Sequence, residues 1–156
     1  MISSMKRSKS RITPLMRRRA RKVAAQTLFQ DLFHAGGAWE WREFVTTRLR
    51  QFADVEGFCQ SLVLGVREQR SVLNSALQAA IPNWNLTRLA KIDLAILLMG
   101  SYELMFTETP YKVAIDEAIE LARSFGGEDS PSFINGVLDR VWRSHSAPGN
   151  ADTHPQ

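Results

Sequence analysis

Residues 92–106 constrain the fold most strongly, because they are apolar on nearly every side of a helical projection. A surface helix needs one apolar stripe, whereas a helix that is apolar all round must be covered by other elements. The longest apolar run, residues 92–100, is interrupted by Asp93 and is much shorter than the roughly 20 residues of a membrane-spanning helix. The sequence therefore predicts a helix buried among other helices, and no membrane segment.

The rest of the chain has the amphipathic pattern that such a bundle requires. Apolar residues recur at spacings of three and four, the period of a helix with one buried face, in residues 17–33, 55–81, 109–125 and 130–143. A shorter helix is expected within residues 39–52. Helix boundaries are marked by glycine and proline at Gly36, Gly37, Pro82, Pro110, Gly126, Gly127 and Pro131. With no strand pattern or internal repeat, we predict an all-α bundle of about six to seven helices.

Basic residues are concentrated at the amino terminus. Residues 1–22 carry nine Lys and Arg and no acidic residue, whereas the rest of the chain carries 11 basic and 16 acidic residues. A basic segment on a mildly acidic body is typical of a protein that binds a polyanion. The alternatives are a solubilising tail and an organelle transit peptide, although the basic character continues into the first helix. We expect residues 1–15 to be a disordered basic arm.

Five cations occupy six consecutive positions in that first helix. They are Arg17, Arg18, Arg19, Arg21 and Lys22. At the amino terminus of a helix they oppose the helix dipole and repel one another, so interactions within the helix do not explain them. Phosphates do, because the arginine fork binds phosphate bidentately. The pattern predicts that Arg18, Arg21 and Lys22 point away from the buried face.

Gln26 and Phe29 follow Lys22 at spacings of four and seven, so they continue the same flank of the helix. An amide and a ring beside a basic patch suit unstacked bases, since the ring can stack and the amide can read a base edge. The alternative for Phe29 is a core residue on the flank of the helix. Duplex DNA is disfavoured, because no helix-turn-helix or zinc-finger spacing is present.

The sequence gives little support for catalysis. His34, His145 and His154 are not at metal-ligand spacing with another His, Cys or carboxylate, so we expect no metal and no cofactor. Cys59, the single cysteine, falls on an apolar helical face and is expected to be a core residue. Glu117 and Glu120 could be imagined as an acid–base pair, but solvated carboxylates on a helix face are commoner. We expect a protein that is not an enzyme.

Several motifs resemble the NusB family of transcription antitermination factors. The first is the cation run followed by Ala25-Gln26-Thr27-Leu28-Phe29. The carboxyl-terminal half carries Tyr102-Glu103-Leu104 and then a long run, Pro110-Tyr111-Lys112-Val113-Ala114-Ile115-Asp116-Glu117-Ala118-Ile119-Glu120-Leu121-Ala122. Ser124-Phe125-Gly126, Glu128-Asp129-Ser130 and Phe133-Ile134-Asn135-Gly136-Val137-Leu138-Asp139 follow. The resemblance covers residues 16–143, which we expect to form the RNA-binding helical domain, with residues 144–156 as a disordered tail.

The resemblance implies an all-helical fold of two small subdomains in a bacterial cytoplasmic protein. It also implies binding of boxA-type single-stranded RNA in nascent ribosomal RNA leaders. The implied partners are a small-subunit ribosomal protein acting as NusE, other Nus factors and RNA polymerase, and the implied outcome is that premature termination is prevented. The RNA-binding role carries over to Arg17, Arg18, Arg19, Arg21, Lys22, Gln26, Phe29, Lys112 and Asp129. Contacts with the ribosomal protein are expected around Asp93 and Tyr102.

Two other functions stay open at this point. The same fold occurs as the amino-terminal domain of ribosomal RNA cytosine methyltransferases, but that function needs a second, cofactor-binding domain, for which we find no segment. A protein-interaction module, in which the basic arm contacts an acidic protein or a membrane surface, is the other. A homodimer is also possible, with Trp39, Trp41 and Phe44 as candidate interface residues.

Overall fold

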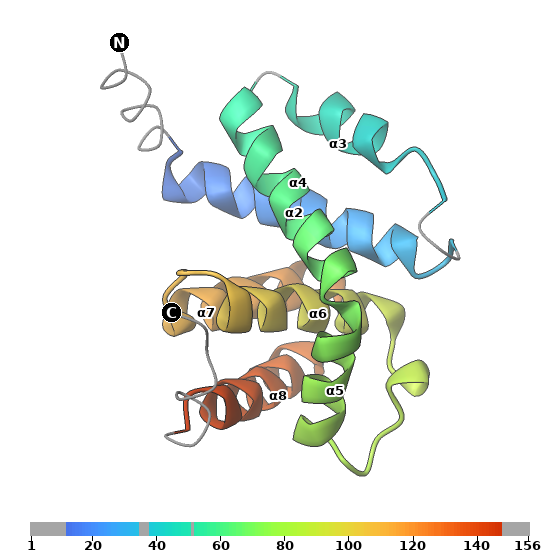
Figure 1. Ribbon diagram of the computed structural model, residues 1–156, viewed down its shortest axis with the longest axis vertical. Helices are drawn as coiled ribbons and strands as arrows, with labels where there is room; N and C mark the ends of the chain where they lie inside the picture. Colours follow the sequence, from blue (N-terminus) through green and yellow to red (C-terminus); the bar gives the residue numbers. More distant parts are fainter. Residues whose placement is uncertain (1–11, 35–37, 51, 148–156) are drawn as a thin grey trace. The chain divides into compact units, whose positions relative to one another are not determined.

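Helices are the regular elements of the part of the chain that the structure describes. The computed structural model describes residues 12–34, 38–50 and 52–147, and contains no strand within these ranges. The chain divides into two units, Met1–Leu64 and Gly65–Gln156. The helices described are α2 (Pro14–Asp31), α3 (Trp41–Leu49), α4 (Ala53–Glu68), α5 (Arg70–Ala80), the 3-10 helix η3 (Leu86–Arg88), α6 (Lys91–Phe106), α7 (Tyr111–Phe125) and α8 (Ser130–His145) (Figure 1). The predicted all-α fold of about six to seven helices in two small subdomains is confirmed.

Helix α2 begins at Pro14, three residues before the predicted start at Arg17. The Thr13 hydroxyl accepts a hydrogen bond from Met16 N at 3.1 Å, and proline takes the first helical position, where its missing N–H costs nothing. The helix dipole acts mainly on charges in the first turn, and residues 18–22 lie beyond that turn. The prediction that the dipole disfavours these cations was therefore wrong, although the cations still repel one another. Residues 1–11 of the predicted arm lie outside the described residues.

In the first unit, α2 packs against α3. The predicted apolar stripe of α2 is buried, except for the half-buried Leu32. The buried residues of α2 are Ala20, Arg21, Val23, Ala24, Ala25, Thr27 and Leu28. Helix α3 contributes Trp41, Val45 and Leu49 to the core. The helix expected within residues 39–52 is thus confirmed, and its apolar residues hold one side of α2.

Helix α6 is the centre of the second unit. Helices α5, α7 and α8 all pack against it, and every residue from Leu94 to Ser101 is buried. Figure 1 shows α6 and α7 side by side with α8 and α5 next to them. The predicted burial of this helix among its neighbours is confirmed. Among the residues described, no helix is both long enough and apolar enough to cross a membrane.

The single long helix predicted over residues 55–81 is two helices, α4 and α5, which meet at Gln69. Gln69 has φ −100° and ψ 15°, outside the helical region, yet its N–H still donates to Gly65 O at 3.0 Å. The next residue of the apolar stripe after Val66 should fall three or four positions later, but the residues there are the polar Gln69 and Arg70. The chain therefore has no apolar side chain to hold this turn against the core, and the prediction of one uninterrupted helix was wrong.

Helices α7 and α8 form a hairpin. Gly126 caps α7, and the Gly127 N–H donates to the Ser130 hydroxyl at 3.0 Å. Asp129 is the residue before α8, and Ser130 and Pro131 are its first two residues, so the helix begins where the predicted range 130–143 begins. Buried residues of α8 are Ser130, Ile134, Val137, Leu138 and Val141, and Phe133 is half-buried. Helix α8 continues to His145, so the predicted tail begins later than residue 144.

The two glycines of α4 provide a test of packing. A methyl group on Gly65 would overlap the Tyr102 ring, whereas one on Gly57 would meet nothing within 4 Å. We expect Gly65→Ala to lower the free energy of unfolding by about 1–3 kcal/mol, because the overlap outweighs the gain in helix propensity. Gly57→Ala should raise it by about 0.5–1 kcal/mol. Urea unfolding followed by circular dichroism measures both, and equal effects of the two variants would contradict the packing of Tyr102.

Candidate nucleic-acid interface

A basic cleft lies in the first unit, between α2, α3 and the start of α4. Its volume is about 780 Å³. The residues that line it are Leu15, Met16, Arg18, Arg19, Lys22, Val23, Gln26, Arg48, Phe52 and Val55. Four of these are cations and, among the described residues that line the cleft, none is a carboxylate. The structure therefore brings together four of the predicted RNA-binding residues, Arg18, Arg19, Lys22 and Gln26, at one concave site.

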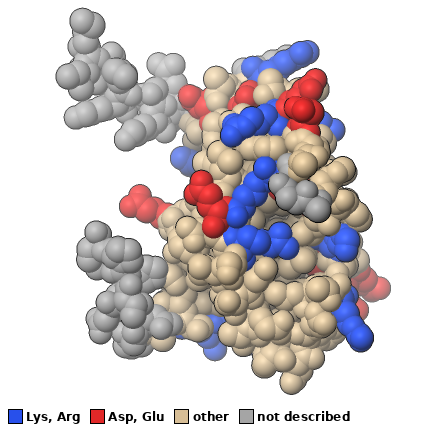
Figure 2. All heavy atoms as spheres, turned by 45° about the vertical axis from the view of Figure 1, so that its right-hand side comes forward, with Lys and Arg blue, Asp and Glu red and all other residues tan. Residues whose placement is uncertain are grey.

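The distribution of charge over the surface is less informative than this cleft. Figure 2 shows Lys and Arg in several separate groups on the visible face, with Asp and Glu beside some of them. A net positive charge alone would not select one group. The concave shape of the cleft does distinguish its group of basic residues, since cations that converge can contact one bound anion from several sides.

Arg21 and Arg17 differ from the other cations of α2. Arg21 is only 4% exposed, and its guanidinium carbon lies 5.4 Å from the centre of the Phe58 ring. Arg17 is half-buried. A spacing of four places both on one flank, which continues through Ala24 and Leu28 on the buried side. The prediction that Arg21 points away from the buried face was wrong, because α2 is buried over a broader arc than one apolar stripe.

Phe29 does not line the cleft. It is half-buried, and its ring meets Phe33 edge to face with centroids 5.1 Å apart. The two alternatives for Phe29, a stacking surface and a flank of the core, both remain consistent with this position. Its role in RNA binding stays a prediction.

The aromatic residues suggested for a homodimer interface have partners within the unit. Trp41 is buried. Trp39 donates from Nε1 to Asp31 Oδ1 at 2.6 Å and stacks on His34. Phe44 lies beneath the Arg48 guanidinium, 3.5 Å from the ring centre. The prediction that Trp41 belongs to a dimer interface was therefore wrong, and the homodimer itself stays a prediction.

Lys112 and Asp129 lie in the second unit, both exposed. Lys112 Nζ is 6.0 Å from the centre of the Tyr111 ring, which stacks on Trp142 with centroids 4.9 Å apart. Lys112 is thus near the end of α8, whereas Asp129 precedes its first residue. At 1.5 Å per residue along a helix, the two are roughly 20 Å apart. The structure does not bring them together at one contact point.

Asp93 and Tyr102, the tentative partner residues, lie on opposite sides of α6. Nine residues separate them, which turns the helix by half a revolution over about 14 Å. Tyr102 packs over Gly65 and stacks on Phe106, and burial, followed by the charges of Glu68 and Glu103, raises its pKa. Tyr102 thus has a packing role. Asp93 Oδ1 is shielded from solvent and has no hydrogen-bond partner among the described residues.

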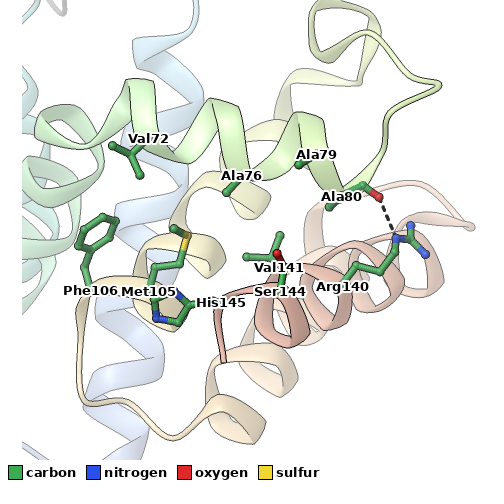
Figure 3. A pocket seen from close by; sticks show the side chains of 10 residues that line it. All are labelled: Val72, Ala76, Ala79, Ala80, Met105, Phe106, Arg140, Val141, Ser144 and His145. Carbon is green, nitrogen blue, oxygen red and sulfur yellow. Dashed lines mark hydrogen bonds between the residues drawn. The ribbon is translucent and has the colours of Figure 1, made fainter. Parts of the chain in front are cut away.

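A second hollow, of about 400 Å³, lies in the second unit between α5, α8 and the end of α6 (Figure 3). Its walls are mainly apolar, from Val72, Ala76, Phe106 and Val141 among others. At one end Arg140 Nε donates to Ala80 O at 2.9 Å, which ties α8 to α5. None of the predicted site residues lines this hollow.

Sequence reasoning missed Arg48 and Phe52. Both line the cleft opposite α2, and the Arg19 guanidinium carbon lies 5.8 Å from the centre of the Phe52 ring. The available signal was the richness of residues 39–52 in aromatics and arginine. Periodicity within one helix could not connect that segment to α2, because the two meet only through tertiary packing.

Cys59 is fully buried, and burial, followed by the negative charge of Glu56, raises the pKa of its thiol to about 12. Within the described residues, no group of three or more His, Cys, Asp or Glu could hold a metal ion. We expect Cys59 in the folded protein not to react with a thiol reagent at pH 8, and to react fully in denaturant. Rapid labelling of the native protein would contradict its burial.

Arg21 and Arg18 should separate stability from binding. Arg21→Ala removes a buried side chain that packs on Phe58, so we expect the free energy of unfolding to fall by about 1–3 kcal/mol. Arg18 is exposed, and Arg18→Ala should change the free energy of unfolding by no more than about 0.5 kcal/mol. Urea unfolding of the two variants checks this, and equal stability of both would mean that Arg21 is not a packing residue.

Comparison with known proteins identifies the family. The profile of the NusB family matches residues 18–143. The transcription antitermination protein NusB of Geobacter sulfurreducens is 42% identical over 127 residues, covering 80% of this chain and 92% of the relative. That of Anaeromyxobacter sp. is 40% identical over 132 residues, covering 81% and 90%.

Solved structures agree with this assignment. A structure of T. maritima NusB is 30% identical, covers 90% of this chain and 98% of its own, and has a TM-score of 0.76. A structure of antitermination factors NusB and NusE in complex with dsRNA is 19% identical, with coverage of 85% and 99% and a TM-score of 0.70, and supports the fold alone. The chain belongs to the NusB family.

Proposed function

We propose that this protein is a transcription antitermination factor that binds boxA-type single-stranded RNA of nascent ribosomal RNA leaders. The observation that carries the proposal is the cleft of the first unit, where Arg18, Arg19, Lys22 and Arg48 converge with no carboxylate among the described lining residues. Relatives about 40% identical over four fifths of the chain are named transcription antitermination protein NusB. The setting of this function is the bacterial cytoplasm, where nascent RNA is made.

The chemistry of the cleft favours RNA that is not fully paired. Its cations can contact phosphates, and its apolar side chains can contact the flat face of a base. In a duplex these faces are hidden by stacking, and only phosphates and groove edges are accessible. A solved structure of NusB and NusE in complex with dsRNA makes duplex RNA the informative competitor in a test.

The proposed role is binding without catalysis. The chain spans 92% and 90% of the two relatives, which leaves those relatives little length for a second, cofactor-binding domain of the methyltransferase kind. Phosphate binding by cations and base contact by apolar groups need no cofactor.

The proposed partner is a small-subunit ribosomal protein acting as NusE, and the pair would join other Nus factors on RNA polymerase. A solved structure of a protein with this fold is described as a complex of NusB with NusE. On this chain Asp93 is the better candidate contact, because it is half-buried and lies on the side of α6 opposite Tyr102, which has a packing role.

The salt dependence of RNA affinity tests the phosphate contacts. Removing a cation that binds one phosphate should reduce the slope of log K against log salt by about 0.7 for single strands. We expect this reduction for Arg18→Ala and for Lys22→Ala with boxA-type RNA, measured by fluorescence anisotropy with and without the ribosomal protein. Arg143→Ala, which removes an exposed cation paired with Asp139 in the second unit, is the matched control.

Two outcomes would contradict the proposal. One is an equal slope for all three variants and the unmodified protein, which would remove the cleft as the phosphate-binding surface. The other is equal affinity for single-stranded boxA-type RNA and for a duplex of the same sequence, which would remove the preference for unpaired bases.

A further inference from the structure

We propose that the basic cleft receives one unpaired base of the RNA, which stacks against the contacting pair Phe52 and Arg19, with Arg48 on the adjacent phosphate. The inference rests on the proposed function and deepens it, since it assigns contacts to Arg48 and Phe52, outside the cation run of α2.

The walls of the cleft have two kinds of chemistry. The apolar part is made by Met16, Val23, Phe52 and Val55, and the basic part by the four cations and the amide of Gln26. A volume of about 780 Å³ is within the range of sites that enclose small organic ligands. A surface that bound phosphates alone would not need an apolar wall, because contact with apolar side chains does not stabilise a bound phosphate. The same contact does stabilise a bound aromatic base.

Phe52 is the side chain best placed to contact a base face. It is half-buried, and its ring also lines a smaller hollow of about 190 Å³ with Ile12, Ala53 and Asp54. The Arg19 guanidinium carbon lies 5.8 Å from the ring centre. Bases stack on aromatic rings and on guanidinium planes, so this contacting pair offers two adjacent stacking surfaces.

Arg48 supplies a cation from the opposite wall. It comes from α3, it is exposed, and its guanidinium carbon lies 3.5 Å from the centre of the Phe44 ring. Its Nη1 also donates to Phe44 O at 3.2 Å. These interactions hold the side chain in position, so binding a phosphate costs less conformational entropy. Cations on both walls suit a strand that enters the cleft with a phosphate on each side of the inserted base.

The test combines a protein variant with an altered RNA. Phe52→Leu keeps an apolar side chain but removes the ring, and an abasic nucleotide removes one base while keeping its phosphate. A series of boxA-type RNAs, each abasic at one position, is titrated against the full-length protein by fluorescence anisotropy. We expect one abasic position to weaken binding about ten-fold, the loss typical of one stacked base.

The Phe52→Leu variant should bind the intact RNA about ten-fold more weakly than the unmodified protein does, and removal of that same base should then cost nothing further. Phe106→Leu, which alters an exposed ring in the second unit, is the matched control and should leave every affinity unchanged. If the losses from Phe52→Leu and from the abasic position simply add, or if Phe52→Leu binds normally, the inference is overturned.

Arg48→Ala tests the inference independently of Phe52, because Arg48 is exposed and its removal is compatible with folding. We expect the salt slope to fall by about 0.7, whereas Arg50→Ala, an exposed neighbour that does not line the cleft, should leave it unchanged. Normal behaviour of Arg48→Ala and Phe52→Leu, with weaker binding by Arg18→Ala, would reject the base site and keep the proposed function. No binding of single-stranded RNA by the unmodified protein would reject both.

Discussion

Exclusion of water from α6 is the constraint on which the second unit depends. Every residue from Leu94 to Ser101 is buried, which no single neighbouring helix could achieve, so α5, α7 and α8 must all pack against it. The close approach also requires small residues, and Gly65 leaves the space that the Tyr102 ring occupies. A residue that resembles a partner contact in the sequence is thus part of the packing of this helix.

The same reasoning, applied to α2, connects the fold to the function. Burial of Ala20, Ala24 and Leu28 sets the rotation of α2 in the first unit. That rotation exposes Arg18, Arg19 and Lys22 towards the cleft and buries Arg21. A run of five cations therefore divides between the core, which buries Arg21, and the cleft, and the division is decided by the packing of α2. Arginine suits both roles, because its guanidinium stacks on a ring as readily as it binds a phosphate.

Sequence periodicity predicted most of the fold, because burial of one helical face leaves a direct pattern, as in α6 and α8. It missed the break at Gln69, where the stripe lacks apolar residues but no glycine or proline marks the site. It also misplaced Arg21, since a helix buried over a broad arc encloses residues outside its apolar stripe. Arg48 and Phe52 could not be connected with α2, because tertiary packing alone brings them there. The family resemblance predicted the function, while the structure shows a basic cleft that is a candidate site for it.

The central claim is that the cleft of the first unit, and not the charge of the whole chain, is the RNA-binding surface. Amide chemical shifts of the full-length protein, measured by NMR during titration with boxA-type single-stranded RNA, test it most directly. The account predicts that the largest changes within the first unit occur in residues 15–26 of α2 and at Arg48, Phe52 and Val55. Changes that spare these residues and occur only in the second unit, or that follow exposed cations such as Arg50 and Arg143 equally, would contradict it.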